Sequence, residues 1–384
     1  MTFSGLLVQL LNGLAGASTL FLVAAGLSLI FGVTRIVNFA HGSFYMLGIY
    51  VAYTAVDQLG PTIGFWPALL LAALVVGLVG ALVEVLLLRR IYHAPELFQL
   101  LATFALALVV KDVVLRLWGP EELLGPRAAG LSGSVEVLGR KVPSYDLFLI
   151  VVGPVVLGLL TLLLTRTRWG TLVRAATQDR DMVAALGVNQ AWLFTSVFAL
   201  GALLAGLGGA LQLPREPANL ELDLHTIGAA FVVVVVGGMG SIPGAFVAAL
   251  LIAQVKAICV WIGLVQIGGI EISFSKLTLV VEFLVMAAVL ILRPWGLMGR
   301  APAASRHASA AEAPLQPPGR LVRWATVALV LGLALLPVLS SASSYTIVLA
   351  IDLMVAALFA ASLHFIMGPA GMHSFGHAAY FGLA

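Results

Sequence analysis

LSLIFGVTRIVNFAHGSFYMLG, residues 27–48, decides the architecture of this chain because a version of it occurs twice. Residues 363–384 read LHFIMGPAGMHSFGHAAYFGLA, and a shift of 336 positions places His41 on His377, with identical Leu, Ile, Gly and Phe at other matching places. A self-match this far apart indicates two copies of one structural unit on one chain. We therefore predict one complete unit followed by the opening of a second.

Composition places the chain in a lipid membrane. Hydrophobic residues make up 61% of it and charged residues 10%, whereas soluble globular proteins carry about 25% charged residues. The sequence therefore predicts an all-α, polytopic membrane protein. The net charge of +3 gives no reason to expect nucleic acid as a partner, and a single cysteine, Cys259, excludes a disulfide within the chain. No Lys or Arg precedes Arg35, so we expect the first apolar run to remain as a spanning helix rather than a cleaved signal peptide.

Apolar runs long enough to span a membrane, about 20 residues each, recur along the first unit. They lie near residues 6–32, 36–56, 65–88, 97–117, 146–165, 191–213 and 276–292. A further apolar region, 226–262, is interrupted by a motif whose residues disfavour a continuous helix. These residues are Gly237, Gly238, Gly240, Ser241, Pro243 and Gly244. We expect two half-length or tilted segments that meet at this broken centre, and eight or nine crossings in the unit. The glycines within 13–32 and 201–209 are expected at close helix contacts.

Positive charge orients the spans, because cytoplasmic loops carry an excess of Lys and Arg. Three basic clusters are expected inside: Arg89 and Arg90; Arg166, Arg168, Arg174 and Arg180; and Arg293, Arg300, Arg306, Arg320 and Arg323. The loop 118–144 is then outside. The first unit covers residues 1–300, and residues 301–320, with four prolines, have the composition of a cytoplasmic linker.

The second unit, residues 321–384, contains apolar spans at 324–339 and 345–367. A cytoplasmic linker makes the first of them run outward and the second inward. The span 6–32 also runs inward into its copy of the repeat, so the repeat is predicted to be parallel. The sequence stops inside a motif that should open the next span. We therefore expect Ala384 to truncate a longer fused chain, and the present chain, lacking half of its pathway, not to transport by itself.

Residues 165–190, TRTRWGTLVRAATQDRDMVAALGVNQ, lie between two spans and are amphipathic. Asp179 and Asp181 are placed near the start of a short helix, where negative charge suits the helix dipole. From periodicity alone, two interpretations stand equally. The segment is an interfacial helix held on lipid headgroups by its arginines, or a docking helix for a soluble partner.

The same segment resembles the cytoplasmic coupling loop of the branched-chain amino acid ABC permeases. The matching residues are Arg168, Gly170, Arg174, Ala175, Gln178, Asp179, Ala184 and Gly187. The runs 26–48, 237–245 and 292–297 are similar to the first permease subunit of that family, the LivH-like one. Residues 321–384 resemble the start of the LivM-like partner subunit, although Met372 and His373 depart from its usual pattern of a Gln and a small or aliphatic residue.

The resemblance implies a transport subunit of the bacterial inner membrane, rather than an enzyme, that needs no cofactor. It implies two cytoplasmic ATPase subunits, a periplasmic substrate-binding protein, and a partner permease subunit or the chain's own complete second half. The chain has no Gly-x-x-x-x-Gly-Lys-Ser/Thr phosphate loop, which fits a subunit that uses ATP only through partners. In this scheme one helix around Arg174 to Gly187 transmits ATPase closure to the spans 146–165 and 191–213, and Gly170 and Gly187 permit tight turns at its ends.

Four polar residues are candidates for contacts with a small substrate: Asn12, Thr19, Asn38 and His41. We predict no metal site, because neither the pair His41 and His377 nor the pair His373 and His377 is accompanied by further ligands. Glu282 lies in an otherwise apolar span and is expected to face the bundle interior, because ionisable groups are costly in lipid.

Three other functions compete with a branched-chain amino acid importer. A urea or amide importer has closely related permeases. An ion-coupled secondary transporter would use Glu282 or Asp112 as its coupling site, but the amphipathic cytoplasmic segment and the lack of paired buried carboxylates argue against it. An intramembrane enzyme is disfavoured because the sequence offers no combination of nucleophile and base or of metal ligands.

Overall fold

A computed structural model describes residues 2–92, 94–267, 270–299, 319–339, 344–367, 377–378 and 382. The chain divides into two compact units, Met1–Ala303 and Ala304–Ala384. Most of the predicted linker, and most of the motif that repeats residues 27–48, including His373, lie outside the described residues. The domain boundaries and the parallel repeat therefore stay predictions. The all-α prediction is confirmed, with two short β-hairpins added to it.

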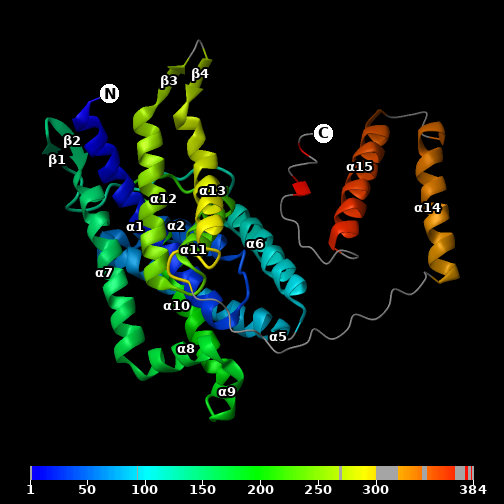
Figure 1. The fold of residues 1–384 in the computed structure, drawn as a ribbon, viewed down its shortest axis with the longest axis horizontal. Helices are drawn as coiled ribbons and strands as arrows, with labels where there is room; N and C mark the ends of the chain where they lie inside the picture. The colour runs from blue at the N-terminus through cyan, green and yellow to red at the C-terminus, as the bar shows by residue number, and fades with distance from the viewer. Residues whose placement is uncertain are drawn as a thin grey trace. The chain divides into compact units, whose positions relative to one another are not determined.

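The first unit is a helical bundle (Figure 1). Its longer helices are α1 (Phe3–Thr34), α2 (His41–Gln58), α4 (Phe65–Val83), α6 (Glu96–Trp118), α7 (Ser144–Arg166), α10 (Gln190–Gln212), α11 (Leu222–Gly237), α12 (Ile242–Ile262) and α13 (Phe274–Leu292). Its short helices are α3 (Gly60–Ile63), the π-helix η1 (Glu84–Leu88), α5 (Arg89–Ile91), α8 (Arg168–Gln178) and α9 (Arg180–Ala185). Strands β1 (Ser134–Val137) and β2 (Arg140–Pro143) pair antiparallel, as do β3 (Leu264–Ile267) and β4 (Ile270–Ser273).

Helix α1 forms the core of the bundle and packs on α12, α10, α7 and α11. Thr2 begins it by accepting a hydrogen bond from the Gly5 amide on its hydroxyl, and it ends at Arg35, whose left-handed φ of 58° turns the chain. The next predicted span, 36–56, begins five residues late. The chain turns between Ile36 and Ala40, where the Asn38 carbonyl accepts from the His41 amide, and α2 begins only at His41.

Glycines allow the central helices to touch through their backbones. A Cβ added to Gly48 of α2 would lie 2.4 Å from the Gly206 carbonyl oxygen of α10. One added to Gly26 of α1 would lie 2.5 Å from the Gly201 carbonyl oxygen. Small residues at such contacts are the usual means of packing helices in membranes, where burying apolar surface against a neighbour brings little gain over lipid. The prediction of close helix contacts is confirmed for Gly26 and Gly201, but it was wrong for Gly16, where an added Cβ meets nothing within 4 Å.

The glycine-rich motif after residue 236 separates two helices, and one expectation about it was wrong. Helix α11 is short, with 16 residues, but α12 has 21 and is of full spanning length rather than half-length. Gly238 and Gly240 have φ values of 100° and 83°, which L side chains rarely adopt. The Ser241 hydroxyl caps α12, and Pro243 falls in the first turn, where a missing N–H is harmless. The motif thus makes a turn between helices instead of unwinding one helix.

Seven helices among the described residues are long and apolar enough to cross a membrane, six of them in the first unit. Helices α11 and α13 contribute shorter apolar stretches, Leu222–Gly237 and Val280–Leu292. The number of crossings, eight or nine, stays a prediction. Helices α5, α8 and α9 gather at one end of the unit, and the N-terminus and both hairpins lie at the other (Figure 1). Because Arg89, Arg90 and Arg168 lie at the first of these ends, it is the cytoplasmic one.

In the second unit the structure describes two helices, α14 (Arg320–Leu339) and α15 (Ser344–Met367). They correspond to the predicted spans 324–339 and 345–367, and they contact one another. Helix α14 begins four residues before its predicted span. Helix α15 is the seventh helix with the length and apolarity of a membrane span.

Candidate functional site

A cavity of about 310 Å³ lies among α1, α11 and α12. It is lined by the halves of these helices that are farther from the cytoplasmic end. Helix α2 contributes Tyr45 to its wall, and the end of α10 and the loop after it contribute Gln212 and Glu216. Both polar and apolar side chains line the cavity. Polar ones are Gln9, Thr19, Tyr45, Gln212, Glu216, His225, Thr226 and Lys256. Apolar ones include Leu20, Val23, Leu222, Ala253, Ala257 and Val260. This is the composition of a binding site for a small, partly apolar molecule.

Lys256 on α12 forms an ion pair with Glu282 on α13 at the edge of this cavity. The Glu282 residue is 7% exposed, so the expectation that it faces the bundle interior is confirmed. Asp112, the other carboxylate considered for ion coupling, is exposed on α6. Lys256 neutralises the buried Glu282 carboxylate. The ion pair explains how a carboxylate can lie in an apolar span, because an unpaired charge in lipid costs free energy.

We expect Lys256→Met to lower the unfolding free energy by about 3 kcal/mol, because it leaves the Glu282 carboxylate buried without its cation. Adding Glu282→Leu to the same chain should restore most of the loss. The measurement is thermal unfolding of the purified chain in detergent. Lys276→Met, which removes an exposed lysine from α13, is the matched control. A single variant as stable as the wild type would contradict the prediction.

The structure does not bring the four predicted substrate residues together. Thr19 lines the cavity, with its hydroxyl donating to the Gly16 carbonyl at 3.0 Å. His41 is fully buried, and its Nε2 lies 2.9 Å from the Val23 carbonyl oxygen, so it contacts the wall of the cavity from behind. Asn12 lines neither this cavity nor the smaller one nearer the cytoplasm.

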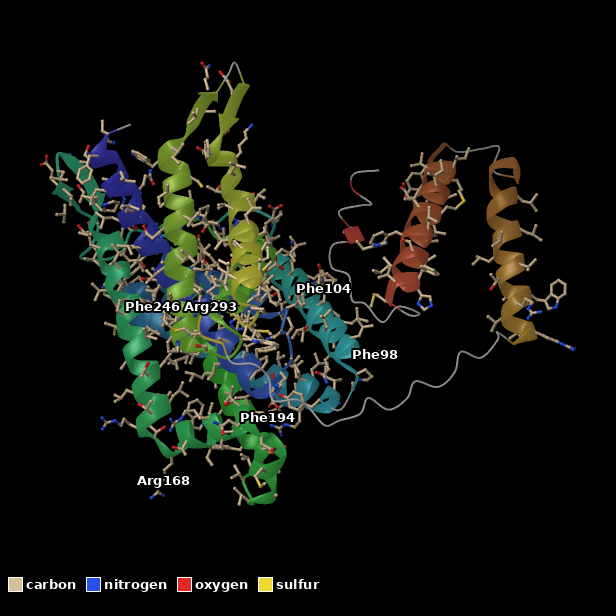
Figure 2. All side chains as sticks on the ribbon, in the orientation of Figure 1. Phe98, Phe104, Arg168, Phe194, Phe246 and Arg293 are labelled. Carbon is tan, nitrogen blue, oxygen red and sulfur yellow. The ribbon has the colours of Figure 1, made fainter. Side chains whose placement is uncertain are left out.

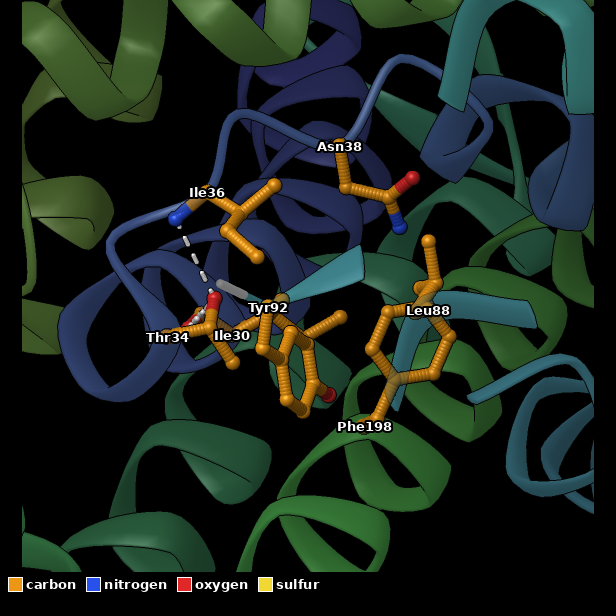
Figure 3. Close-up of a pocket in the computed structure, with 7 residues that line it drawn as sticks. All are labelled: Ile30, Thr34, Ile36, Asn38, Leu88, Tyr92 and Phe198. Atoms are coloured by element: carbon orange, nitrogen blue, oxygen red, sulfur yellow. Dashed lines mark hydrogen bonds between the residues drawn. The ribbon is translucent and has the colours of Figure 1, made fainter. Parts of the chain in front are cut away.

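Asn38 belongs to that smaller, separate cavity of about 10 Å³ (Figure 3). It lies in the turn between α1 and α2 and is 1% exposed. Neither its amide nitrogen nor its amide oxygen has a hydrogen-bond partner in the protein. The space is of the size that one water molecule needs, and it holds the polar group that such a water would serve. Asn38 therefore does not line the larger cavity, and its contact with a substrate stays a prediction.

A buried carboxylate, expected from the sequence to lie near Arg89, links two helices near the cytoplasmic end. Glu84 is 0% exposed and begins the π-helix η1. Its carboxylate accepts hydrogen bonds from Arg89 at 3.1 Å, from the Tyr92 hydroxyl at 3.0 Å and from the Thr195 hydroxyl of α10 at 2.5 Å. Burial, together with the Glu84 charge, raises the pKa of Tyr92 above its ordinary value. The cluster fixes the end of α4 against the first turns of α10.

Glu84→Ala should lower the unfolding free energy by about 3 kcal/mol, because three buried or partly buried donors lose their acceptor at once. Thermal unfolding in detergent measures the loss. Glu136→Gln, at an exposed glutamate on β1, should leave stability within about 0.5 kcal/mol of the wild type. Equal stability of the two variants would show that the Glu84 cluster contributes nothing.

The segment 165–190 forms a projection of two helices, α8 and α9, rather than the single predicted helix around Arg174 to Gly187. The chain breaks at Asp179, whose extended backbone (φ −150°) ends α8 and whose carboxylate accepts from the Met182 amide to begin α9. Gly187 turns the chain after α9 with a φ of 82°, as predicted. Gly170 lies in the first turn of α8, where a Cβ would come within 2.4 Å of the Leu163 carbonyl oxygen, so its missing side chain permits the tight turn from α7 into α8.

Hydrogen bonds tie α8 to the bundle. The Trp169 indole donates to the Ser196 hydroxyl of α10 at 2.8 Å, and the Arg35 guanidinium at the end of α1 donates to the Thr177 carbonyl at 3.2 Å. Arg168 and Arg174 are exposed, and the Arg168 side chain extends away from the bundle (Figure 2). The remaining residues of the predicted coupling set lie on the same projection: Ala175 is half-buried, and Gln178, Asp179 and Ala184 are exposed.

The tip of this projection is apolar and uncovered. Met182 is 59% exposed and Leu186 75% exposed, and the alanines between them are exposed too. Side chains of this size on a cytoplasmic tip beyond the bundle are typical of a surface that a protein partner covers. The docking and the interfacial interpretations of the segment both stay predictions.

A bundle of apolar helices around a polar-lined cavity, with a cytoplasmic projection, defines a membrane permease. The sequence profile of the family described as "Branched-chain amino acid transport system / permease component" matches residues 9–290. The chain belongs to this family, and it is a multi-pass membrane protein.

Two relatives illustrate the match. The high-affinity branched-chain amino acid transport system permease protein BraD of Pseudomonas aeruginosa is 28% identical over 304 residues, which cover 77% of this chain and 96% of BraD. The permease protein LivH of Escherichia coli is 26% identical over 310 residues, with the same coverage of 77% and 96%. No solved structure matches the chain.

LivM, a permease protein of the same kind of system in Salmonella typhimurium, is 26% identical over 304 residues, which cover 72% of this chain and 67% of LivM. A match of that length extends far beyond residues 321–384. It therefore relates LivM to the first unit as well, and it does not single out the second unit as its counterpart.

Proposed function

We propose that this chain is the membrane-spanning permease subunit of an ATP-driven importer for branched-chain amino acids in the bacterial inner membrane. The family match and the transport systems named for BraD and LivH support the type of cargo. The observation that carries the ATP-driven mechanism is the α8–α9 projection, with Met182 and Leu186 uncovered at a cytoplasmic tip. Two ATPase subunits would cover this tip, and a periplasmic binding protein would deliver cargo to the opposite end.

The contacts of α8 support a direct route from the ATPase subunits to the membrane. Helix α8 follows α7 after a single residue, Thr167, whose hydroxyl accepts from the Gly170 amide at 3.0 Å. The Trp169 and Arg35 hydrogen bonds connect it to α10 and α1. A partner that pulls or tilts α8 would therefore move three bundle helices together, and two of them, α1 and α10, border the cavity.

We further propose that residues 321–384 open a second, LivM-like permease unit fused to the first. The repeat of residues 27–48 at 363–384 supports this, as does a spanning helix, α15, that leads into the second copy as α1 leads into the first. The fused unit, or a separate partner permease, would supply the second half of the pathway.

The test is reconstitution of the chain, extended through its second unit, with its ATPase subunits and binding protein in proteoliposomes. ATP-dependent uptake of L-leucine and co-purification of the ATPase subunits are expected. Urea and acetamide, offered with the binding protein encoded beside the chain, separate the related importers. Uptake of leucine driven by an ion gradient without ATP would refute the ATP-driven importer.

A further inference from the structure

We propose that the 310 Å³ cavity binds the amino acid cargo during transport, with Lys256 contacting its α-carboxylate and Glu216 its α-ammonium group. This inference rests on the proposed function. It assigns a binding role to two charged residues that none of the sequence motifs includes. A free amino acid carries one positive and one negative charge. The cavity wall carries one of each as well, on Lys256 and Glu216.

The Lys256 ammonium group has N–H donors that remain available to a ligand. This group has three N–H donors, and the contact with Glu282 uses one side of it. The side chain remains 26% exposed, and it lines the cavity. The carboxylate of Glu282 also fixes the position of the ammonium group, so that the lysine is placed before a carboxylate ligand arrives.

Glu216 supplies the opposite charge from the loop after α10. One of its carboxylate oxygens accepts from the Gln212 amide at 3.3 Å, and a carboxylate can accept several more hydrogen bonds. The neighbouring cation, Arg215, forms its ion pair with Asp146 of α7 at 2.9 Å. Arg215 is therefore engaged with another carboxylate, and Glu216 faces the cavity with acceptor capacity for an ammonium group.

The apolar part of the wall suits an aliphatic side chain. Leu20 and Val23 of α1 and Ala253 and Ala257 of α12 line this part of the cavity. Gly16 shapes this part too: a Cβ placed on it meets nothing within 4 Å, so the position opens directly onto empty space. Ligand cavities measure about 300–1,000 Å³, and this one is at the small end, as a leucine-sized molecule requires.

The place of the cavity fits the route of the cargo. It lies in the outer half of the bundle, toward the end that carries the N-terminus and the hairpins (Figure 1). On the cytoplasmic side of the cavity, Nε2 of the fully buried His41 lies 2.9 Å from the Val23 carbonyl oxygen. This contact joins α2 to α1. A ligand would enter from outside and would need α1 and α2 to part before it could leave inward.

The experiment compares three variants in the reconstituted importer by maximal leucine uptake rate, ATPase assembly and basal ATP hydrolysis. Gly16→Leu should fill the cavity and lower uptake about tenfold or more, while the ATPase subunits stay bound. Gly158→Leu is its matched control, because Gly158 lies exposed on α7 with nothing within 4 Å of an added Cβ. Glu216→Gln removes the charge alone and should also lower uptake about tenfold.

The outcomes separate this inference from the function on which it rests. A wild-type importer that takes up no leucine refutes the proposed function. Wild-type uptake together with near-normal uptake by Gly16→Leu or by Glu216→Gln overturns the cavity as the cargo site and leaves the importer standing. Loss of uptake in both variants, with Gly158→Leu normal and the ATPase subunits still bound, supports the proposal.

Discussion

Gly209→Ala, the addition of one methyl group to α10, is expected to destabilise the bundle by about 3 kcal/mol or more. The new Cβ would lie 2.1 Å from the Tyr45 carbonyl oxygen and 3.1 Å from the Ile49 amide nitrogen, both of them backbone atoms of α2. Backbone cannot swing aside as a side chain can, so α2 and α10 must separate along their length. The purified chain should unfold at a markedly lower temperature in detergent, and the yield of folded protein should fall.

Gly228→Ala is the matched control, and its effect should have the opposite sign. Gly228 also lies inside a helix, α11, but a Cβ there meets nothing within 4 Å. Alanine is favoured over glycine in a helix interior by about 0.5–1 kcal/mol, so this variant should be slightly stabilised. If the two alanine variants had equal stability, the close contact of α2 with α10 would have to be abandoned.

The second large effect is expected at the cytoplasmic tip. Met182→Asp combined with Leu186→Asp should weaken ATPase binding about a hundredfold, because charge replaces two apolar side chains at the centre of a protein contact. Both side chains are exposed, so the fold should be unaffected. Co-purification with the ATPase subunits at a series of concentrations measures the loss, and leucine uptake should fall with it.

Leu124→Asp controls for added charge on an exposed leucine. Leu124 is 78% exposed and lies in the loop 118–144, at the end of the bundle opposite to α9. It should leave ATPase binding unchanged. Normal binding by the variant of Met182 and Leu186 would show that the ATPase subunits dock elsewhere.

The sequence was sufficient to predict where most of the spanning helices lie, because this depends on local properties. Apolar runs of about 20 residues must be helical in lipid, and arginine-rich ends remain inside. Asp179, which the sequence placed near the start of a short helix, shows how much such a local signal gives. An aspartate before a short apolar run is a typical N-cap, and it predicts the start of α9 and hence two helices in the projection.

Contacts between distant residues could not be predicted in the same way. Glu84 and Thr195 are 111 residues apart, and the π-helix that brings the carboxylate to α10 has no signal in composition. Likewise Thr19 and Asn38 are both polar and close in sequence, yet one faces the larger cavity and the other a water-sized one. The side of the helix that each occupies follows from how α1 packs, which a single sequence does not reveal.

Helix α1 has 32 residues without a proline, and at 1.5 Å per residue it is a rod about 48 Å long. Just beyond its C-terminal end, the Arg35 guanidinium donates a hydrogen bond to the Thr177 carbonyl of α8. Nearer its N-terminal end, Gln9, Thr19 and Val23 border the cavity. A helix of this length carries a displacement of one end along to the other. If ATPase subunits draw the Arg35 end, as proposed, the part of α1 beside the cavity would move with it. The opening of one side of the membrane and the closing of the other would then be a single movement, with no separate signal passing between them.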